Sequence, residues 1–310
     1  EIPASSQPLT SYTGTYRDAF KGELGWNRVI PSVLNTVRRS VFQSPTAHPA
    51  CFSMSDMTVD YRLCSTAPGT VARLRKYARS LDATVHDVML AALARALARH
   101  LPRRLWRGRP RDVALGTIVN TRPDASADVN EMLGAFLAYH VVRSSPDTAG
   151  SFEDAVRQIH ALTAATKAKR GHLNSLVSMK LSAAIWPYLK EAARPHFLRR
   201  VLPLTAGISN VVLRDGWLGA PTTDRILGYA RAASTGPMVP LVLSPTTVGN
   251  EMNLGLSFRV TAFSSAKIDA IQSMLLEQLD GVGRPSVGVW PTDRIPTLRP
   301  ALCKDRLTAA

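Results

Sequence analysis

Residues 84–101, TVHDVMLAALARALARHL, predict a helix at the centre of the fold. Their apolar side chains recur at helical spacing and form a stripe too wide for one partner, which indicates packing against a sheet and further elements. Thr84 is a suitable N-cap, and Asp87 three residues later completes an acidic variant of the capping box. The apolar positions of this helix are Val85, Val88, Met89, Ala92, Leu93, Ala96, Leu97 and Leu101.

Other helical patterns lie on both sides of this stretch. An amphipathic surface helix is predicted at residues 68–82, and another helix at 151–170, where Ser151 is the N-cap and Asp154 occupies the capping-box position. Two further regions are predicted to be helical: residues 171–204, interrupted by Pro187 and Pro195, and residues 264–281, which end at Gly281. Short peripheral helices are predicted between Ser11 and Phe42.

Strand patterns are interspersed with these helices. Residues 113–143 predict two strands separated by a polar turn that contains Pro123. Residues 240–263 predict a hairpin turning at 246–250, since apolar and polar residues alternate from Met252 to Thr261 and one face is expected to be buried. Other strands are predicted at residues 51–63, 207–214 and 225–233. This mixture indicates an α/β fold, a layered sandwich with a mixed sheet, rather than a purely parallel doubly wound sheet.

The composition is that of a globular protein with a basic surface. The chain has 310 residues, is 45% hydrophobic and carries 38 Lys and Arg against 23 Asp and Glu, a formal net charge of +15. Nucleic acid, anionic lipid, a phosphate-rich cofactor and an acidic protein are the candidate partners, against the alternative of an arginine-rich surface without a partner. Nucleic acid ranks last, because aromatics make up only 6% of residues and are not interleaved with the basic ones.

Cysteine usage and hydropathy indicate a cytoplasmic protein. The odd set of Cys51, Cys64 and Cys303 has no close spacing, so neither a disulfide framework nor a zinc knuckle is expected. No transmembrane segment or signal peptide is predicted. The first residue is Glu1, which suggests a processed product or a fragment.

Catalytic motifs are sparse. There is no G-x-S-x-G and no H-E-x-x-H, and GVGRPS at 281–286 follows a helix instead of a strand, so it is not taken as a dinucleotide fingerprint. The seven histidines are scattered singly, and a structural role is expected for His86, His100, His140, His160 and His172, since a histidine without a positioned partner is not a site.

The order of elements from Asp60 to Gly281 resembles the C-terminal half of the thioester-dependent acyltransferase superfamily. This superfamily includes condensation domains, chloramphenicol acetyltransferase and wax ester synthases. ATVHDVMLAALARAL resembles the helix after its crossover strand, and LGTIVNTRP with LGAFLAYHVVR resembles its paired strands, which end in arginine. GISNVVLRDGWLGAP resembles the Ser-Asn-Val segment of wax ester synthases, and MNLGLSFRVTAFSSAKIDAI their penultimate strand and last helix.

The resemblance implies a chloramphenicol-acetyltransferase-like sandwich lobe without its catalytic base. The family uses a His-His-x-x-x-Asp motif in its N-terminal half, whose second histidine deprotonates the acceptor. This chain has no adjacent histidines and no histidine followed four residues later by aspartate. We therefore expect residues 1–50 to hold peripheral helices and a crossover from a missing N-terminal lobe, 51–284 to form the C-terminal lobe, and 285–310 to be a basic surface tail. An inactive homologue is the alternative to a missing lobe.

The resemblance also implies which residues support the reaction, with no catalytic residue and no metal ligand in this chain. Arg122 and Asn120 would face the motif, and Arg122 would form an ion pair with the aspartate of the motif. The alternative is that Arg122 is an exposed arginine in a turn. Ser209 and Asn210 would line the substrate tunnel or, alternatively, cap a strand end. Trp217, near Asp215, is expected to anchor a loop rather than to contact substrate. The expected donor-docking rim comprises Arg103, Arg104, Arg107, Arg109 and Arg111, although each could be solvated decoration.

The predicted function is transfer of an acyl group from a carrier-protein or coenzyme A thioester to a hydroxyl or amine acceptor. The expected partners are an acyl carrier protein or acyl-CoA and an N-terminal lobe with the His-His-x-x-x-Asp motif. No tightly bound cofactor is expected, the phosphopantetheine thioester being a co-substrate. Such a chain fits secondary metabolism or lipid assembly. The competing hypothesis is a noncatalytic scaffold of the same fold that docks a carrier domain.

Overall fold

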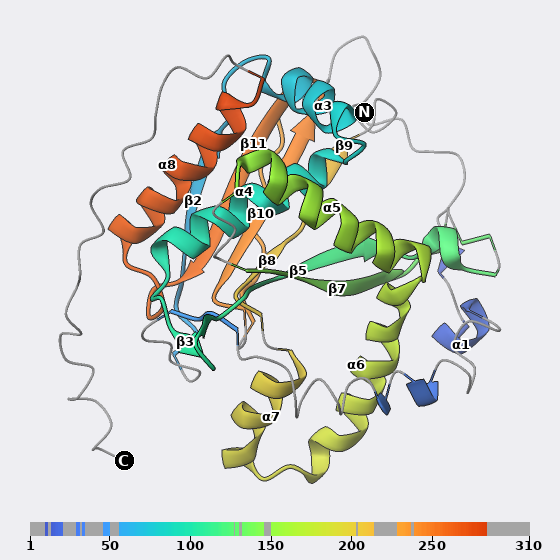
Figure 1. The fold of residues 1–310 in the computed structure, drawn as a ribbon. Coiled ribbons are helices and arrows are strands. Elements are labelled where there is room, and N and C mark those ends of the chain that lie inside the picture. The colour runs from blue at the N-terminus through green and yellow to red at the C-terminus, as the bar shows by residue number, and fades with distance from the viewer. Residues whose placement is uncertain are drawn as a thin grey trace, which may run out of the picture.

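The computed structural model describes the chain with gaps. The described residues are 10–11, 14–20, 29–31, 33–34, 46–49, 56–126, 128–129, 132–145, 150–202, 204–213, 228–236 and 239–283. Cys51, Cys303, Trp217 and the tail at 285–310 lie outside them. Figure 1 shows a mixed sheet with helices α3, α4, α5 and α8 on one side and the α6 and α7 segment extending from its edge.

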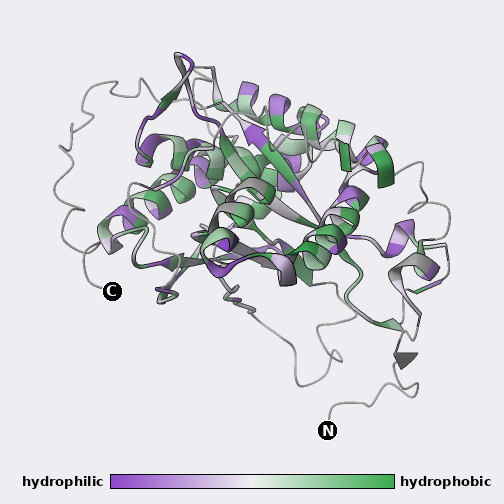
Figure 2. Ribbon diagram, turned by 90° about the horizontal axis from the view of Figure 1, so that it is seen from below, coloured by the Kyte–Doolittle hydropathy of each residue, from purple (hydrophilic) through white to green (hydrophobic). Residues whose placement is uncertain are grey.

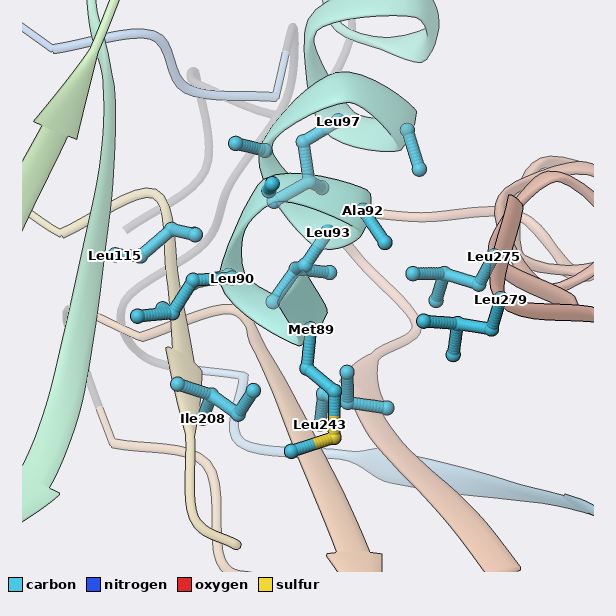
Figure 3. Close-up of a cluster of buried hydrophobic side chains, with 14 of the residues drawn as sticks. Met89, Leu90, Ala92, Leu93, Leu97, Leu115, Ile208, Leu243, Leu275 and Leu279 are labelled. Carbon is cyan, nitrogen blue, oxygen red and sulfur yellow. The ribbon is translucent and has the colours of Figure 1, made fainter. Parts of the chain in front are cut away.

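Helix α4 (Val85–His100) occupies the centre of the helical layer, as its sequence predicts. The predicted capping box is present: Thr84 Oγ1 accepts a hydrogen bond from Asp87 N at 3.2 Å, and Asp87 Oδ2 accepts from Thr84 N at 2.9 Å. In Figure 3, Leu90 points toward Leu115 and Ile208 of the sheet, and Ala92 faces the neighbouring helix. The helix is therefore covered on more than one side.

The other helices of the layer pack around α4. They are α3 (Thr70–Ser80), α5 (Phe152–Ala168) and α8 (Ser265–Gly281), and α4 lies between α5 and α8. Ser151 and Asp154 form the predicted capping box of α5. In Figure 2 the helices carry both apolar and hydrophilic sides, as expected for elements that each bury one face.

The main sheet contains seven strands, in the order β2-β11-β10-β8-β5-β7, with β9 also paired to β10. Strands β8 and β10 are parallel, as are β5 and β8, whereas the β10–β11, β11–β2 and β5–β7 pairs are antiparallel. The predicted mixed sheet is confirmed. Its strands are β2 (Val59–Ser65), β5 (Val113–Asn120), β7 (Leu137–Ser144), β8 (Ala206–Ile208), β9 (Val211–Leu213), β10 (Leu241–Val248) and β11 (Glu251–Arg259).

The hairpin β10–β11 turns at Gly249 and Asn250 as predicted, but its second face is also buried. Ser257 and Arg259 are 1% and 0% exposed, although alternation predicted that they face solvent. Residues 228–236 lie across this face and form no strand, so the strand predicted at 225–233 is wrong over its described part. Polar side chains of the sheet, rather than a neighbouring strand, bond to the backbone of this segment: Tyr61 Oη donates to Arg231 O, Asn253 Nδ2 to Tyr229 O, and Ala233 N donates to Ser257 Oγ.

Shorter elements complete the described part. Pro187 lies in the 3-10 turn η3 (Trp186–Tyr188) that ends α6 (Asn174–Ile185), whereas Pro195 lies in the first turn of α7 (Arg194–Val201). The remaining elements are α1 (Tyr16–Ala19), β1 (Thr10–Ser11), β3 (Leu105–Trp106), β4 (Arg109–Pro110), β6 (Met132–Leu133), η1 (Arg122–Asp124), η2 (Gly171–Leu173) and η4 (Glu191–Ala193).

The buried apolar side chains of the described residues form two clusters. The main core lies between the helical layer and the sheet. A second, smaller cluster lies beneath the loop that joins β5 to β7, and it comprises Ala19, Phe20, Val129, Phe136, Ala138, Leu173 and Leu176.

Candidate functional site at the carboxyl ends of β5 and β8

The predicted active-site residues come to one edge of the sheet. Asn120 and Arg122 end β5 and begin the loop after it, and Ser209 and Asn210 follow β8. Strands β5 and β8 are parallel, with Thr117 opposite Ile208, so their carboxyl ends lie at the same edge. The structure thus brings together two segments that are distant in the sequence.

Arg122 is half-buried and bonded to its own loop. Its Nη1 donates to Val129 O at 3.1 Å and its Nη2 to Gly134 O at 3.3 Å. The guanidinium carbon lies 4.8 Å from the ring centre of Phe136, a cation–π contact. The adjacent Asn120 side chain accepts from Arg122 N at 3.1 Å. These contacts give Arg122 a structural role in closing the loop, and its role toward a motif aspartate remains a prediction.

Ser209 and Asn210 lie where β8 passes into β9. Ser209 N donates to Leu243 O at 2.9 Å, and the guanidinium of Arg231 donates to Ser209 O and Ser209 Oγ. Asn210 Oδ1 is buried without a protein hydrogen-bond partner in the described part of the chain. An unpaired amide oxygen at this edge is a polar group available to a ligand or a water molecule.

Sequence reasoning missed a cluster of histidines behind this edge. His86 Nε2 is hydrogen-bonded to Thr117 Oγ1 on β5 at 2.6 Å, and Thr117 pairs with His140 on β7. The rings of His160 and His172 each donate to an aspartate, at 3.0 Å and 2.8 Å. These histidines stand singly in the sequence, and the fold brings them together because α4, α5, β7 and η2 meet beside β5. Their uniform spread along the sequence gave no signal of this.

Burial keeps two of these histidines neutral. It lowers the pKa of His86 to about 4 and, together with the neighbouring His86 and His172, that of His140 to about 4. Both ring nitrogens of His140, which is 8% exposed, lack a protein partner among the described residues. Burial would raise the pKa of Asp87, but hydrogen bonds from His160, Thr84 and Thr163 outweigh it and hold the pKa below its usual value.

The predicted donor-docking arginines lie at the opposite end of β5. The β3–β4 hairpin, which turns at Arg107 and Gly108, precedes Val113 at the start of that strand. Strand β5 separates it from Arg122 by about 23 Å at ~3.3 Å per residue. Arg103, Arg104 and Arg107 are exposed, Arg111 is half-buried, and the side chain of Arg109 lies outside the described residues. The guanidinium of Arg107 lies over the ring of Trp106.

Neither a metal centre nor a membrane span emerges from the described residues. Among them, no group of three or more histidine, cysteine, aspartate or glutamate side chains is arranged to hold a metal ion. None of the described helices has the length and apolar character needed to cross a membrane.

Comparison of the sequence with known families assigns the chain to one of them. A family model described as the condensation domain matches residues 26–180, half of the 310 residues. The matched range includes α4, both strands β5 and β7, and Arg122. The chain therefore belongs to the condensation domain family, and the predicted resemblance is confirmed. No curated protein matches the sequence.

Several solved structures are similar in fold, and this chain spans about half the length of each of the three described below. A structure of condensation domain-mediated chain release from the enacyloxin polyketide synthase is 15% identical, with a TM-score of 0.53 over 86% of this chain and 50% of that one. The EpoB cyclization-docking bidomain from Sorangium cellulosum is 14% identical, with a TM-score of 0.59 over 91% and 54%. The X-domain in complex with OxyB, from teicoplanin biosynthesis, is 16% identical, with a TM-score of 0.52 over 82% and 53%. These likenesses show the fold that this chain shares with the solved structures.

Proposed function

We propose that this chain is the C-terminal lobe of a condensation-type acyltransferase. It would help to move an acyl group from a phosphopantetheine thioester, on a carrier protein or coenzyme A, to a hydroxyl or amine. The observation that carries the proposal is the meeting of Asn120, Arg122, Ser209 and Asn210 at one sheet edge of a chain that belongs to the condensation domain family.

The general base of this reaction would come from residues outside the 310. The sequence contains no His-His-x-x-x-Asp, and the chain spans about half the length of the condensation structures that it matches. Within the described part, His86 and His172 are already hydrogen-bonded to Thr117 and Asp124, and burial of His140 disfavours its charged form. A base must reach the proton of the acceptor, which these three inward-facing side chains are not arranged to do.

The basic hairpin supports a donor that approaches from the other end of β5. Arg103, Arg104 and Arg107 are exposed and positively charged. Carrier proteins are acidic around the modified serine, and coenzyme A carries phosphates, so either would be attracted to this rim. A separation of about 23 Å along β5 would be bridged by an extended arm such as phosphopantetheine.

The experiment measures acyl transfer from acyl-carrier and acyl-CoA thioesters to alcohols and amines. The 310-residue chain alone is expected to be inactive, and activity is expected when a polypeptide with the His-His-x-x-x-Asp motif accompanies it. The accompanying polypeptide is sought by intact mass and co-purification. Full activity of the 310 residues alone would contradict an external base.

Substitution of Arg122 tests whether this edge of the sheet takes part in the reaction. In the active enzyme, Arg122→Ala should lower turnover at least tenfold, on the order expected for loss of a positioning group, with little change in donor binding. Arg107→Ala is the matched control, since this arginine also covers an aromatic ring but lies on the distant hairpin; it should leave turnover unchanged and weaken donor binding. Wild-type turnover of Arg122→Ala would remove Arg122 from the site.

A second candidate is a noncatalytic docking module. One solved structure with this fold is an X-domain in complex with OxyB, and Arg122 here is already bonded within its own loop. This function would be favoured if no polypeptide with the histidine motif accompanies the chain and a carrier domain binds it without acyl transfer.

A further inference from the structure

The loop from Thr121 to Phe136 has its own set of anchors. Thr121 N donates to Phe136 O at 2.9 Å, which closes the loop where it leaves and rejoins the sheet. Arg122 ties the interior of the loop together, and Ser126 N donates to Ala19 O at 2.7 Å. Phe136 is 4% exposed and belongs to the second apolar cluster. The described part of the loop is therefore held by contacts within itself, to Ala19 and within the second apolar cluster.

Asp124 links this loop to the helical side of the molecule. It ends the η1 turn that begins at Arg122, and its Oδ2 accepts from His172 Nε2 at 2.8 Å. Arg170 Nε lies 3.5 Å from the other carboxylate oxygen. The side chains of His172 and Asp124 are only 6% and 16% exposed. Because water screens such a pair weakly, removing one partner leaves a poorly solvated polar group and costs more than at the surface.

The histidine end of this contact is fixed. His172 lies in η2, directly before Leu173, which is fully buried in the second apolar cluster. Ser175, one turn further on, accepts a hydrogen bond from Tyr139 N of β7 through its Oγ at 3.1 Å. A fixed donor at 2.8 Å restricts the position of Asp124 and, through the short η1 turn, that of Arg122.

We propose that His172 is a positioning residue for Arg122, holding the β5–β7 loop through its hydrogen bond to Asp124. This rests on the proposed function, in which Arg122 acts at the carboxyl end of β5. His172 touches no reacting group. Its effect is to keep the Arg122 guanidinium in one place while substrate and the rest of the enzyme assemble around it.

The test combines amide hydrogen exchange of the loop with kinetics of the active enzyme. His172→Ala should speed exchange of the loop amides from Thr121 to Phe136 and lower kcat at least tenfold, with KM for the donor nearly unchanged. His172→Gln should restore both, because its Nε2 amide can donate to Asp124 from a similar position. The control is His160→Ala, which removes the other histidine–aspartate bond, at 3.0 Å to Asp87 of α4 rather than to the loop. It should leave loop exchange unchanged.

Two outcomes would overturn the inference: loop exchange that is unaltered in His172→Ala, and faster exchange without a fall in kcat. Failure of His172→Gln to restore kcat while it restores exchange would also overturn it. The exchange measurement needs no substrate. If the wild-type enzyme shows no acyl transfer, the proposed function fails, and unaltered loop exchange would still refute the anchor separately.

Discussion

The main core and the second apolar cluster differ in how they are assembled. In the main core, α4 alone contributes nine buried apolar residues, between the sheet and the neighbouring helices. Among the described residues, the second cluster has seven buried members, drawn from α1 and the residue after it, the β5–β7 loop, the start of β7, η2 and α6. Long helices and strands provide most of the first cluster, whereas the second takes one or two residues from each of several segments that are distant in the chain. The candidate site lies at the boundary, since β5 belongs to the main core and the loop with Arg122 rests on the second cluster.

This difference indicates that the two clusters contribute differently to stability. A large core built from helices and strands opens only on global unfolding, whereas a small satellite cluster can open locally. Loops that bind or gate ligands are drawn from the less stable parts of a protein. The fold would thus hold the strand more firmly than the loop that follows it.

Replacing a buried leucine by alanine in each of the two clusters should have the largest effect on stability. Leu93→Ala should lower the free energy of unfolding by about 2–5 kcal/mol, because it leaves a cavity inside the main core. Leu173→Ala removes an equally buried leucine from the second cluster and should cost less globally, about 2 kcal/mol at the low end of that range, while it speeds exchange in the loop at 121–136. Denaturant unfolding and hydrogen exchange measure the two effects.

Leu105→Ala is the control for both substitutions, since its side chain is 58% exposed and should change stability by less than about 0.5 kcal/mol. Equal global costs for Leu93→Ala and Leu173→Ala, with no local opening, would mean that the two clusters form one cooperative core.

The second-largest loss of stability should come from lowering the pH. The histidines responsible lie where the two clusters meet. The pKa of His86 and of His140 is about 4 in the folded protein, below the ordinary 6.5. The unfolded chain therefore binds more protons between these values, so stability is full above pH 6.5 and is lost as the pH falls toward 4. Each histidine contributes at most about 3 kcal/mol. Denaturant midpoints at pH 7 and pH 4.5 measure the loss.

His140→Asn should flatten this pH dependence more than His100→Asn, at the last turn of α4, where burial also lowers the pKa of the histidine. An acid loss that His140→Asn leaves unchanged would mean that other groups titrate in this range.

The smallest expected effect concerns a polar contact inside the helical layer. Asp280 of α8 accepts hydrogen bonds from Ala67 N at 3.0 Å and from Thr70 Oγ1 at 2.5 Å, at the beginning of α3. Gly69, the N-cap of α3, has no side chain to perform this role. Asp280→Ala should therefore cost about 1 kcal/mol, the usual value of a helix cap, without altering loop exchange.

Asp269→Ala, on the same helix, is the matched control. Its carboxylate is 62% exposed and lies 3.6 Å from Arg62, so its removal should cost less than about 0.5 kcal/mol. A change in loop exchange from Asp280→Ala would show that the helical layer and the loop are coupled.

The sequence predicted most of the main core and little of the second cluster. The periodicity of residues 84–101 and their capping box specified α4, and the alternation from Met252 to Phe258 specified the core face of β11. The burial of Ser257 and Arg259 could not be predicted, because it depends on distant segments: Ser257 Oγ accepts from Ala233 N, and the Arg259 guanidinium donates to Asp56 O. The second cluster joins Phe20 to Leu176 and leaves no periodic pattern.

The candidate site was likewise predicted only in part from the sequence. Arg122 and Asn120 were predicted as site residues through the family resemblance, whereas their bonds to Val129, Gly134 and each other are known only from the folded loop. The histidines were each assigned a structural role, and their meeting around Thr117 escaped prediction.

By itself the sequence determined the α/β class, the central helix, the strand that leads to Arg122 and the absence of a His-His-x-x-x-Asp motif. These follow from local patterns, since side chains repeat with the period of the element that they form and a motif is a matter of spacing. Only the tertiary structure decided that β8 runs parallel beside β5, that the histidines converge behind it and that His172 holds Asp124. Each of these joins residues far apart in the chain, and their proximity is set by packing rather than by any local preference.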